Sequence, residues 1–192
     1  FAFQLNVNVL GPFRVTQAFA PLLIASKGRI STTGSLSGTV TWGLGGPYTM
    51  SKFAIEAYTD VLAAEMERFE VKVSIVEPGN YKSRISVNMV ERLAANGYST
   101  EGSLFAEQMN RVLGGPQDRA HFQDPDDVAA AFLHAMSDEN PQRRYLVVPN
   151  QGEAEVTIRA ALMRLAQLNA KQPFAYSRDQ LVKMLDEALA AQ

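Results

Sequence analysis

Tyr48 and Lys52 stand four positions apart along the chain. Residues with this spacing lie on one face of an α-helix, one turn from each other. A free phenol has a pKa of about 10, but a cation within about 4–6 Å lowers the pKa of a neighbouring acid by roughly 1–3 units. The pair therefore predicts a phenol that exchanges a proton near neutral pH. The same spacing also occurs on ordinary solvated helices, so other groups must lie beside the pair before it indicates catalysis.

Two further side chains and one turn offer groups that could act at the same point. Ser35 directly follows a short β-branched run, where its hydroxyl could reach the atom that the phenol serves, although a serine there is also typical of a turn. Asn8 stands upstream and could equally be an ordinary polar helix residue. A second β-branched run is followed by residues 77–83, Glu-Pro-Gly-Asn-Tyr-Lys-Ser, which could simply end a strand.

The elements that must position these groups alternate between strand and helix patterns. β-Branched and apolar runs predict strands over residues 28–33, 71–76 and 144–148. A one-sided apolar face predicts a helix that begins at Pro47 and ends near Arg68. This order is typical of an α/β fold with a parallel sheet and flanking helices. Because ligands of such sheets bind at the carboxyl ends of the strands, chemistry is expected at residues 33–38, 77–83 and 148–152.

The first helical pattern, over residues 3–26, is interrupted by Pro12 and Pro21, which predicts a broken or kinked helix. In an α-helix the N–H of residue 12 would bond the carbonyl of residue 8, but proline has no N–H. The carbonyl of Asn8 is therefore expected to seek another partner, for which a bound water is suited. Alternatively, the helix begins only at Pro12 and Asn8 is a plain cap.

The chain is predicted to form a single domain over residues 1–192. Residues 80–123 show weak periodicity, which is typical of a substrate lid with short helices of its own. Asp124 is expected to cap the next helix, with Pro125 as its first residue. Residues 152–192 form a C-terminal extension of two helices, and the second opens with a capping box at residues 177–180.

Composition excludes several classes of protein. The chain has 192 residues, of which 46% are hydrophobic and 20% charged, as in an ordinary globular domain. Its 18 basic and 20 acidic residues give a net charge of −2, which disfavours nucleic acid and anionic membranes as partners. With no cysteine and only two histidines, we expect no disulfide and no metal site. The longest uninterrupted apolar stretch is far shorter than the roughly 18 residues of a membrane span, so a soluble protein is expected.

Taken together, these segments resemble the short-chain dehydrogenase/reductase family. The resemblance covers residues 3–83 most clearly and extends to about residue 150. The family's motifs align with Asn8, Ser35, Tyr48, Lys52, Pro78, Gly79 and Ser83. At the last of these positions the family usually has threonine. The style of the motifs leans toward hydroxysteroid and retinol dehydrogenases. The resemblance implies a Rossmann-type fold and hydride transfer between NAD or NADP and an alcohol or carbonyl.

The resemblance also implies a role for each matched residue. Tyr48 is expected to donate or accept the proton, while Ser35 hydrogen-bonds the same substrate oxygen. Lys52 is expected to lower the pKa of Tyr48 and to bind the nicotinamide ribose. A water beside Asn8 would link the lysine to solvent. The cofactor's carboxamide would lie against the turn formed by Pro78, Gly79 and Asn80, with a further hydroxyl from Ser83.

One departure from the family's pattern is large. The glycine-rich phosphate loop and the residue that selects NAD or NADP would precede residue 1, so the sequence is expected to be the C-terminal two-thirds of an enzyme. Gly43-Leu44-Gly45 cannot replace that loop, because the strand-to-helix context and the last glycine are missing. An inactive fragment or oligomerisation remnant of such an enzyme is the alternative. A more remote alternative is a serine hydrolase that uses Ser35 with His121 or His134, although the G-x-S-x-G motif is lacking.

The remaining expectations concern substrate, assembly and location. A bulky lipophilic alcohol or ketone fits the apolar side chains of the lid region better than a sugar or hydroxy acid does. We expect a homodimer or homotetramer in the cytoplasm. The apolar wall would be formed by Ile85, Val87, Met89, Leu93, Leu104, Phe105, Met109 and Leu113.

Overall fold

The computed structural model describes residues 1–191. Three strands form one parallel sheet in the order β1-β2-β3: β1 (Arg29–Thr33), β2 (Lys72–Pro78) and β3 (Arg144–Val147). In the register of the sheet, Thr33 pairs with Val76 and Pro78 pairs with Val147. The carboxyl ends of the three strands therefore meet at one edge of the sheet. The predicted α/β fold with a parallel sheet is confirmed.

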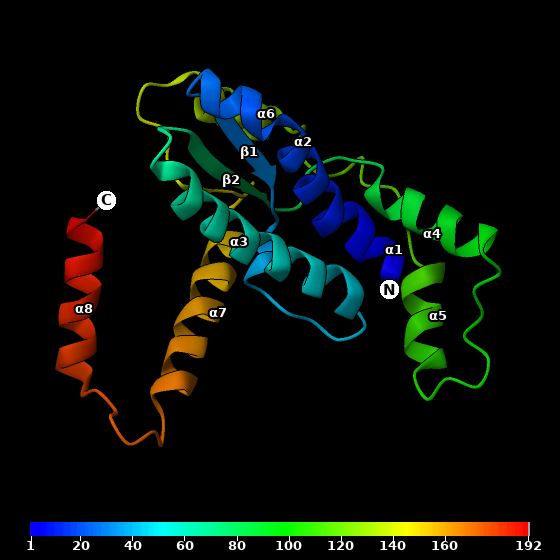
Figure 1. Cartoon of the computed structure of the whole chain (residues 1–192). Coiled ribbons are helices and arrows are strands. Elements are labelled where there is room, and N and C mark those ends of the chain that lie inside the picture. The colour runs from blue at the N-terminus through cyan, green and yellow to red at the C-terminus, as the bar shows by residue number, and fades with distance from the viewer. Residues whose placement is uncertain (192) are drawn as a thin grey trace.

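Helices cover both faces of this sheet (Figure 1). Residues alternate between the two faces along a strand, so neighbouring residues of β2 contact different layers. Val73 packs against Leu62 and Met66 of α3 (Gly46–Glu67), and α2 (Gly11–Ala25) adds Ile24 to this cluster. On the other face, Val76 packs with residues of α6 (Asp126–Ser137). The long helix predicted from Pro47 is thus confirmed as α3, and its buried face anchors the site at its N-terminal end.

The first helical segment consists of three parts without a break: α1 (Ala2–Leu5), a π-helical turn (Asn6–Leu10) and α2 (Gly11–Ala25). The predicted interruption at Pro12 is present as a π-turn. In this turn Gly11 donates its N–H to the carbonyl of Asn6, one residue further back than in an α-helix. The alternative in which the helix begins at Pro12 is wrong.

This segment also corrects the expectation that no part of the chain is long enough for a membrane span. Because the helix continues through both prolines, it has 24 residues, and an 18-residue window within it has a mean hydropathy of 1.2, enough to cross a membrane by length and composition alone. One such helix is weak evidence for a span, and none of that window is buried within the structure. Ala20 and Ile24 pack against the cluster between α3 and β2.

The remaining helices follow the expected order. Two short helices lie in the lid region, α4 (Ile85–Ala95) and α5 (Ala106–Gly114). The C-terminal pair is α7 (Gln151–Asn169) and α8 (Arg178–Ala190), and the capping box at Ser177 is confirmed. In Figure 1 the pair forms an arm that extends away from the sheet.

The start of α6 differs from the prediction. Pro125 is the N-cap residue, and its carbonyl accepts the N–H of Ala129 at 3.0 Å, so the helix begins at Asp126. Asp124 makes no cap and instead pairs with Lys82, with 3.1 Å between the carboxylate and the ammonium. Sequence spacing could not show that Lys82 lies beside Asp124. The lysine competes for the carboxylate that would otherwise cap the helix.

Gly34 lies where the chain leaves β1, and its N–H bonds the carbonyl of Val76 at 2.7 Å. A Cβ at this position would lie 2.8 Å from Oε1 of Glu56 and 2.9 Å from the side chain of Ile75, which is fully buried. Neither neighbour can give way without disturbing the core. Glycine is therefore required for the chain to pass this closely over the sheet and α3.

We expect Gly34→Ala to lower the free energy of unfolding of the full-length protein by about 1–3 kcal/mol, the usual cost of overpacking. Urea denaturation measures this. Gly43→Ala is the matched control, since a Cβ there meets no atom within 4 Å, and it should change stability by less than about 0.5 kcal/mol. Equal effects of the two substitutions would show that the close contact at Gly34 does not matter.

Candidate active site

Ser35 is held at the end of β1 by its own turn. It stands directly before a short 3-10 helix (Leu36–Gly38), and its hydroxyl oxygen accepts the N–H of Ser37 at 3.2 Å. The same hydroxyl donates to the Ser37 hydroxyl at 3.1 Å. The side chain is buried. These bonds fix the Ser35 hydroxyl at the carboxyl edge of the sheet, where the sequence predicted it.

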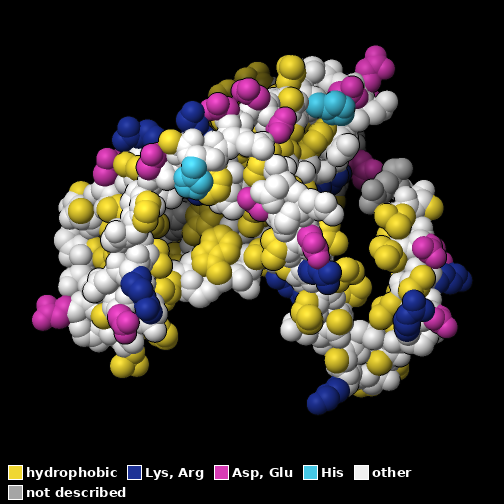
Figure 2. Space-filling view, turned by 180° about the vertical axis from the view of Figure 1, so that it is seen from behind, with side chains coloured by type: hydrophobic (Ala, Val, Ile, Leu, Met, Phe, Trp, Pro, Cys, Tyr) yellow, Lys and Arg dark blue, Asp and Glu magenta, His cyan; other side chains and the backbone are white. Residues whose placement is uncertain are grey.

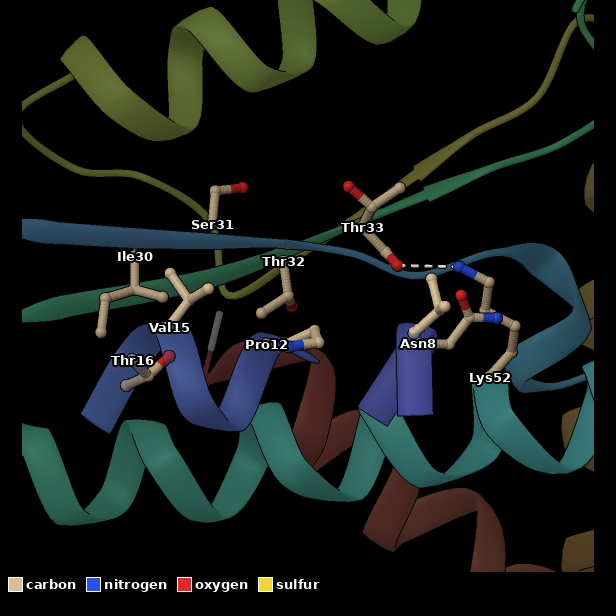
Figure 3. Close-up of a pocket in the computed structure, with 10 residues that line it drawn as sticks. Asn8, Pro12, Val15, Thr16, Ile30, Ser31, Thr32, Thr33 and Lys52 are labelled. Atoms are coloured by element: carbon tan, nitrogen blue, oxygen red, sulfur yellow. Dashed lines mark hydrogen bonds between the residues drawn. The ribbon is translucent and has the colours of Figure 1, made fainter. Parts of the chain in front are cut away.

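Tyr48 and Lys52 lie in the first two turns of α3, on the same face of the helix. The Lys52 ammonium is 5.6 Å from the centroid of the Tyr48 ring. It donates a hydrogen bond of 3.0 Å to the carbonyl of Thr33, the last residue of β1 (Figure 3). The structure thus brings Ser35, Tyr48 and Lys52 together from the end of one strand and the start of one helix.

Burial dominates the electrostatics of this group. It raises the pKa of Tyr48 above its ordinary value, while a hydrogen bond with Ser35 and the charge of Arg119 oppose the rise. Burial also lowers the pKa of Lys52 to about 8, against the opposing influence of Glu56. That Lys52 lowers the pKa of Tyr48 stays a prediction, since its ammonium lies 5.6 Å from the ring centroid but is not among the groups that shift this pKa here. The lysine directs its ammonium to Thr33, and Ser35 and Arg119 are the groups that lower the pKa of the phenol.

Asn8 lies in the π-helical turn and is tied to α3 by a short chain of bonds. Its side-chain amide donates to the Ser51 hydroxyl at 2.9 Å, and that hydroxyl donates to the carbonyl of Tyr48 at 2.7 Å. Asn8 and Lys52 line the same end of a cavity of about 480 Å³ between α2 and β1 (Figure 3). The structure therefore brings Asn8 to the lysine. A water relay through its carbonyl stays a prediction.

The turn after β2 is held by hydrogen bonds to β3 and to α7. Gly79 donates its N–H to the carbonyl of Val147 at 2.8 Å, and Asn80 donates its N–H to Oε2 of Glu153 at 2.8 Å. A Cβ at Gly79 would collide with the Glu153 carboxylate and with Val148. Pro78, Gly79 and Asn80 thus lie at the same sheet edge as Ser35. Ser83 follows them as an exposed residue just before α4.

Two residues at this turn were not predicted. Glu153 enters from the first turn of α7, and Arg119 enters from the loop between α5 and α6. For Glu153, the available signal was a carboxylate that follows the carboxyl end of β3. It was missed because position 153 lies just beyond residues 148–152, the segment in which chemistry was expected. Arg119 stands in a stretch with weak periodicity and no motif, so the sequence offers no signal for it.

The serine hydrolase alternative lacks a base. Nδ1 of His134 bonds the Tyr145 hydroxyl at 2.8 Å, on the face of the sheet that α6 covers. The two histidine side chains of the chain lie apart at the surface shown in Figure 2. Within residues 1–191 neither His121 nor His134 bonds Ser35, and no cluster of three or more His, Asp or Glu side chains could hold a metal ion.

Comparison with known proteins agrees with this geometry. The model of the short chain dehydrogenase family matches residues 2–94. A 3beta-hydroxysteroid dehydrogenase of Caenorhabditis elegans is 45% identical over 93 residues, which cover 48% of this chain and 24% of that protein. The mitochondrial D-beta-hydroxybutyrate dehydrogenase of Bos taurus is 32% identical over 156 residues, 73% of this chain and 44% of that protein.

A solved structure supports the same conclusion. The 3-oxoacyl-(acyl-carrier protein) reductase of Brucella melitensis, whose structure holds NAD, is 25% identical with a TM-score of 0.51 and aligns over 76% of this chain and 48% of its own. The chain belongs to the short-chain dehydrogenase/reductase family, as its motifs predicted. It spans less than half the length of each of these three relatives.

The low pKa of Lys52 can be measured directly. In protein labelled with 13C-lysine, one Cε signal should titrate near pH 8, well below the ordinary value of 10.5, because burial penalises the ammonium. The native state then binds fewer protons than the unfolded state between these two pH values, so this residue's contribution to stability rises as pH increases across that window. The signal should vanish in Lys52→Arg. If every lysine titrates near the ordinary value, the ammonium is not buried as described.

Proposed function

We propose that the protein carrying this chain is an NAD(P)-dependent oxidoreductase that interconverts an alcohol and a carbonyl, with Tyr48 as the group that exchanges the proton. The observation that carries the proposal is the convergence of Ser35, Tyr48 and Lys52 at the carboxyl edge of the sheet. Membership of the short-chain dehydrogenase/reductase family supports the same class of reaction.

The residues at this edge fit a nicotinamide cofactor. The Lys52 ammonium has three N–H donors, of which the bond to Thr33 uses one, so donors are left for ribose hydroxyls. The cofactor's carboxamide would lie against Pro78, Gly79 and Asn80, with Ser83 just before α4. The related reductase of Brucella melitensis is a structure with bound NAD. When bound, the nicotinamide would supply or accept the hydride.

The chain's own residues would handle the proton. In the direction of reduction, negative charge develops on the carbonyl oxygen, and a phenol kept protonated by burial is suited to donate to it. The Ser35 hydroxyl, released from its bond to Ser37, would donate a hydrogen bond to the same oxygen. In the direction of oxidation, Tyr48 must first lose its proton, and the Lys52 ammonium over its ring would stabilise the phenolate.

An apolar body for the substrate is part of this proposal. The lid helices α4 and α5 leave large apolar side chains open to solvent, including Ile85, Met89 and Phe105. Leu104, in the loop before α5, is 95% exposed. Exposed apolar groups beside a site would gain free energy by covering a hydrophobic molecule.

Tyr48→Phe tests the proposal in the full-length enzyme. Loss of a general acid should lower kcat by about 10²–10⁴-fold, while the Kd for NADH and NADPH changes by less than about threefold, since only one hydroxyl is removed. Turnover of secondary alcohols and ketones, followed through NAD(P)H absorbance, measures the first quantity and calorimetry measures the second.

Tyr58→Phe is the matched control for that experiment. Tyr58 lies on the same helix, and its buried hydroxyl has no hydrogen-bond partner within residues 1–191. Its removal should leave kcat within about twofold, because no bond is lost. A Tyr48→Phe enzyme that keeps more than a tenth of its kcat would remove Tyr48 from the proposed role. Absence of any turnover in the unsubstituted full-length protein would overturn the proposed function.

A further inference from the structure

Arg119 is fixed against the turn that follows β2. Its Nε donates to the carbonyl of Tyr81 at 3.1 Å, and its Nη2 donates to Oδ1 of Asn80 at 3.0 Å. Its guanidinium lies 4.4 Å from the centroid of the Phe122 ring. A guanidinium held by two hydrogen bonds and an aromatic ring has a defined orientation and little freedom to move to another partner.

The charge of this arginine is not paired. Among residues 1–191, no ion pair includes Arg119. The acidic group that influences it most is Glu153, whose Oε2 already accepts the N–H of Asn80. Arginine has five N–H donors, and its bonds to Tyr81 and Asn80 use two of them. Three donors and a positive charge are thus left for a ligand in a half-buried place.

The same arginine acts electrostatically on Tyr48, the group proposed to exchange the proton. Its charge lowers the pKa of Tyr48, and Tyr48 in turn influences the pKa of Arg119, so the two side chains are electrostatically coupled. The other cation of the site, Lys52, bonds the carbonyl of Thr33, and its other donors are those proposed to hold the cofactor ribose. Arg119 is thus the cation acting on Tyr48 whose donors remain available to the substrate.

We propose that Arg119 binds the carboxylate of the substrate, so that the alcohol or carbonyl compound is a hydroxy acid or an oxo acid. This rests on the function proposed above and deepens it. The planar fork of a guanidinium matches the two oxygens of a carboxylate. The exposed apolar residues of the lid suit the remainder of the molecule, so an acid with an apolar body satisfies both features. A phosphate of the cofactor is the other anion that could meet these donors, and the experiment separates the two.

The experiment compares hydroxy acids with their methyl esters, using the full-length enzyme with NAD and NADP. The series places the carboxylate at increasing distances from the alcohol, because the required spacing is unknown. Each ester keeps the alcohol and the apolar body but has no charge. The proposal expects a higher kcat/KM for at least one acid than for its ester. Arg119→Gln should lower kcat/KM for that acid by about 30-fold or more, the usual effect of removing one member of a desolvated charge pair.

The same substitution should lower kcat/KM for the ester, and the affinity for either cofactor, much less than it lowers kcat/KM for the acid. Some loss is expected for both, because Arg119 also acts on Tyr48 and holds the turn after β2. Arg119→Lys should restore part of the preference for the acid, since it keeps the charge and loses the fork. Arg111→Gln is the matched control, because Arg111 lies in the same lid region but is exposed and paired with Glu107. It should leave the ratio of acid to ester unchanged.

Each other outcome has a distinct meaning. Equal losses for acid and ester would show that Arg119 only positions the turn after β2, and would overturn the proposal. A loss of cofactor affinity with an unchanged ratio would assign the anion to a cofactor phosphate, and would overturn it as well. Turnover of neutral alcohols with no preference for any acid would overturn this inference and leave the proposed function intact. If no alcohol or ketone is turned over, the proposed function itself fails.

Discussion

The hydrogen bond from the Lys52 ammonium to the Thr33 carbonyl joins α3 to the end of β1, and the arrangement of the site depends on it. Burying an ammonium costs free energy unless the charge keeps good partners. Here the cost is visible in a pKa lowered to about 8, and the Thr33 carbonyl and the charge of Glu56 offset part of it. Because Ser35 directly follows β1 and Tyr48 precedes Lys52 by one turn, this one bond sets the distance between the serine hydroxyl and the phenol.

A cluster of charged side chains around Arg144 supports the position of Lys52. Arg144, at the start of β3, bonds Glu77 of β2 at 2.9 Å, and it bonds Glu56 and Asp60 of α3 at 3.0 and 3.2 Å. One cation thus serves three carboxylates, which ties two strands to the helix. Burial and the neighbouring Glu56 raise the pKa of Glu77 to about 8, against the opposing charge of Arg144. Glu56 stands one turn after Lys52, so this cluster holds in place the acid that favours the charged form of the lysine.

The sequence predicted the strands, α3 and the convergence of the motif residues because each has a local cause. β-Branched runs form strands, and the spacing of Tyr48 and Lys52 alone places them on one face. The roles of Arg119 and Glu153, the pairing of Asp124 with Lys82, and the direction in which the pKa of Tyr48 shifts have no local cause. They depend on which distant segments pack together and on how much water is excluded. The extent of the first helix and its interruption near Pro12 were predicted, but the form of the interruption, a π-turn, was not.

The site residues that the sequence predicted and those that it did not predict also lie in different parts of the chain. Asn8, Ser35, Tyr48 and Lys52 all fall within residues 2–94, which the family model matches. Arg119 and Glu153, which hold the turn after β2, fall outside that range. The matched segment holds the groups proposed for proton exchange, which any alcohol or ketone requires. The later segments bring charge to the same edge of the sheet from loops and a helix start, whose sequences can change with little cost to the core. Discrimination between substrates is therefore expected to reside in residues that the family motifs do not include.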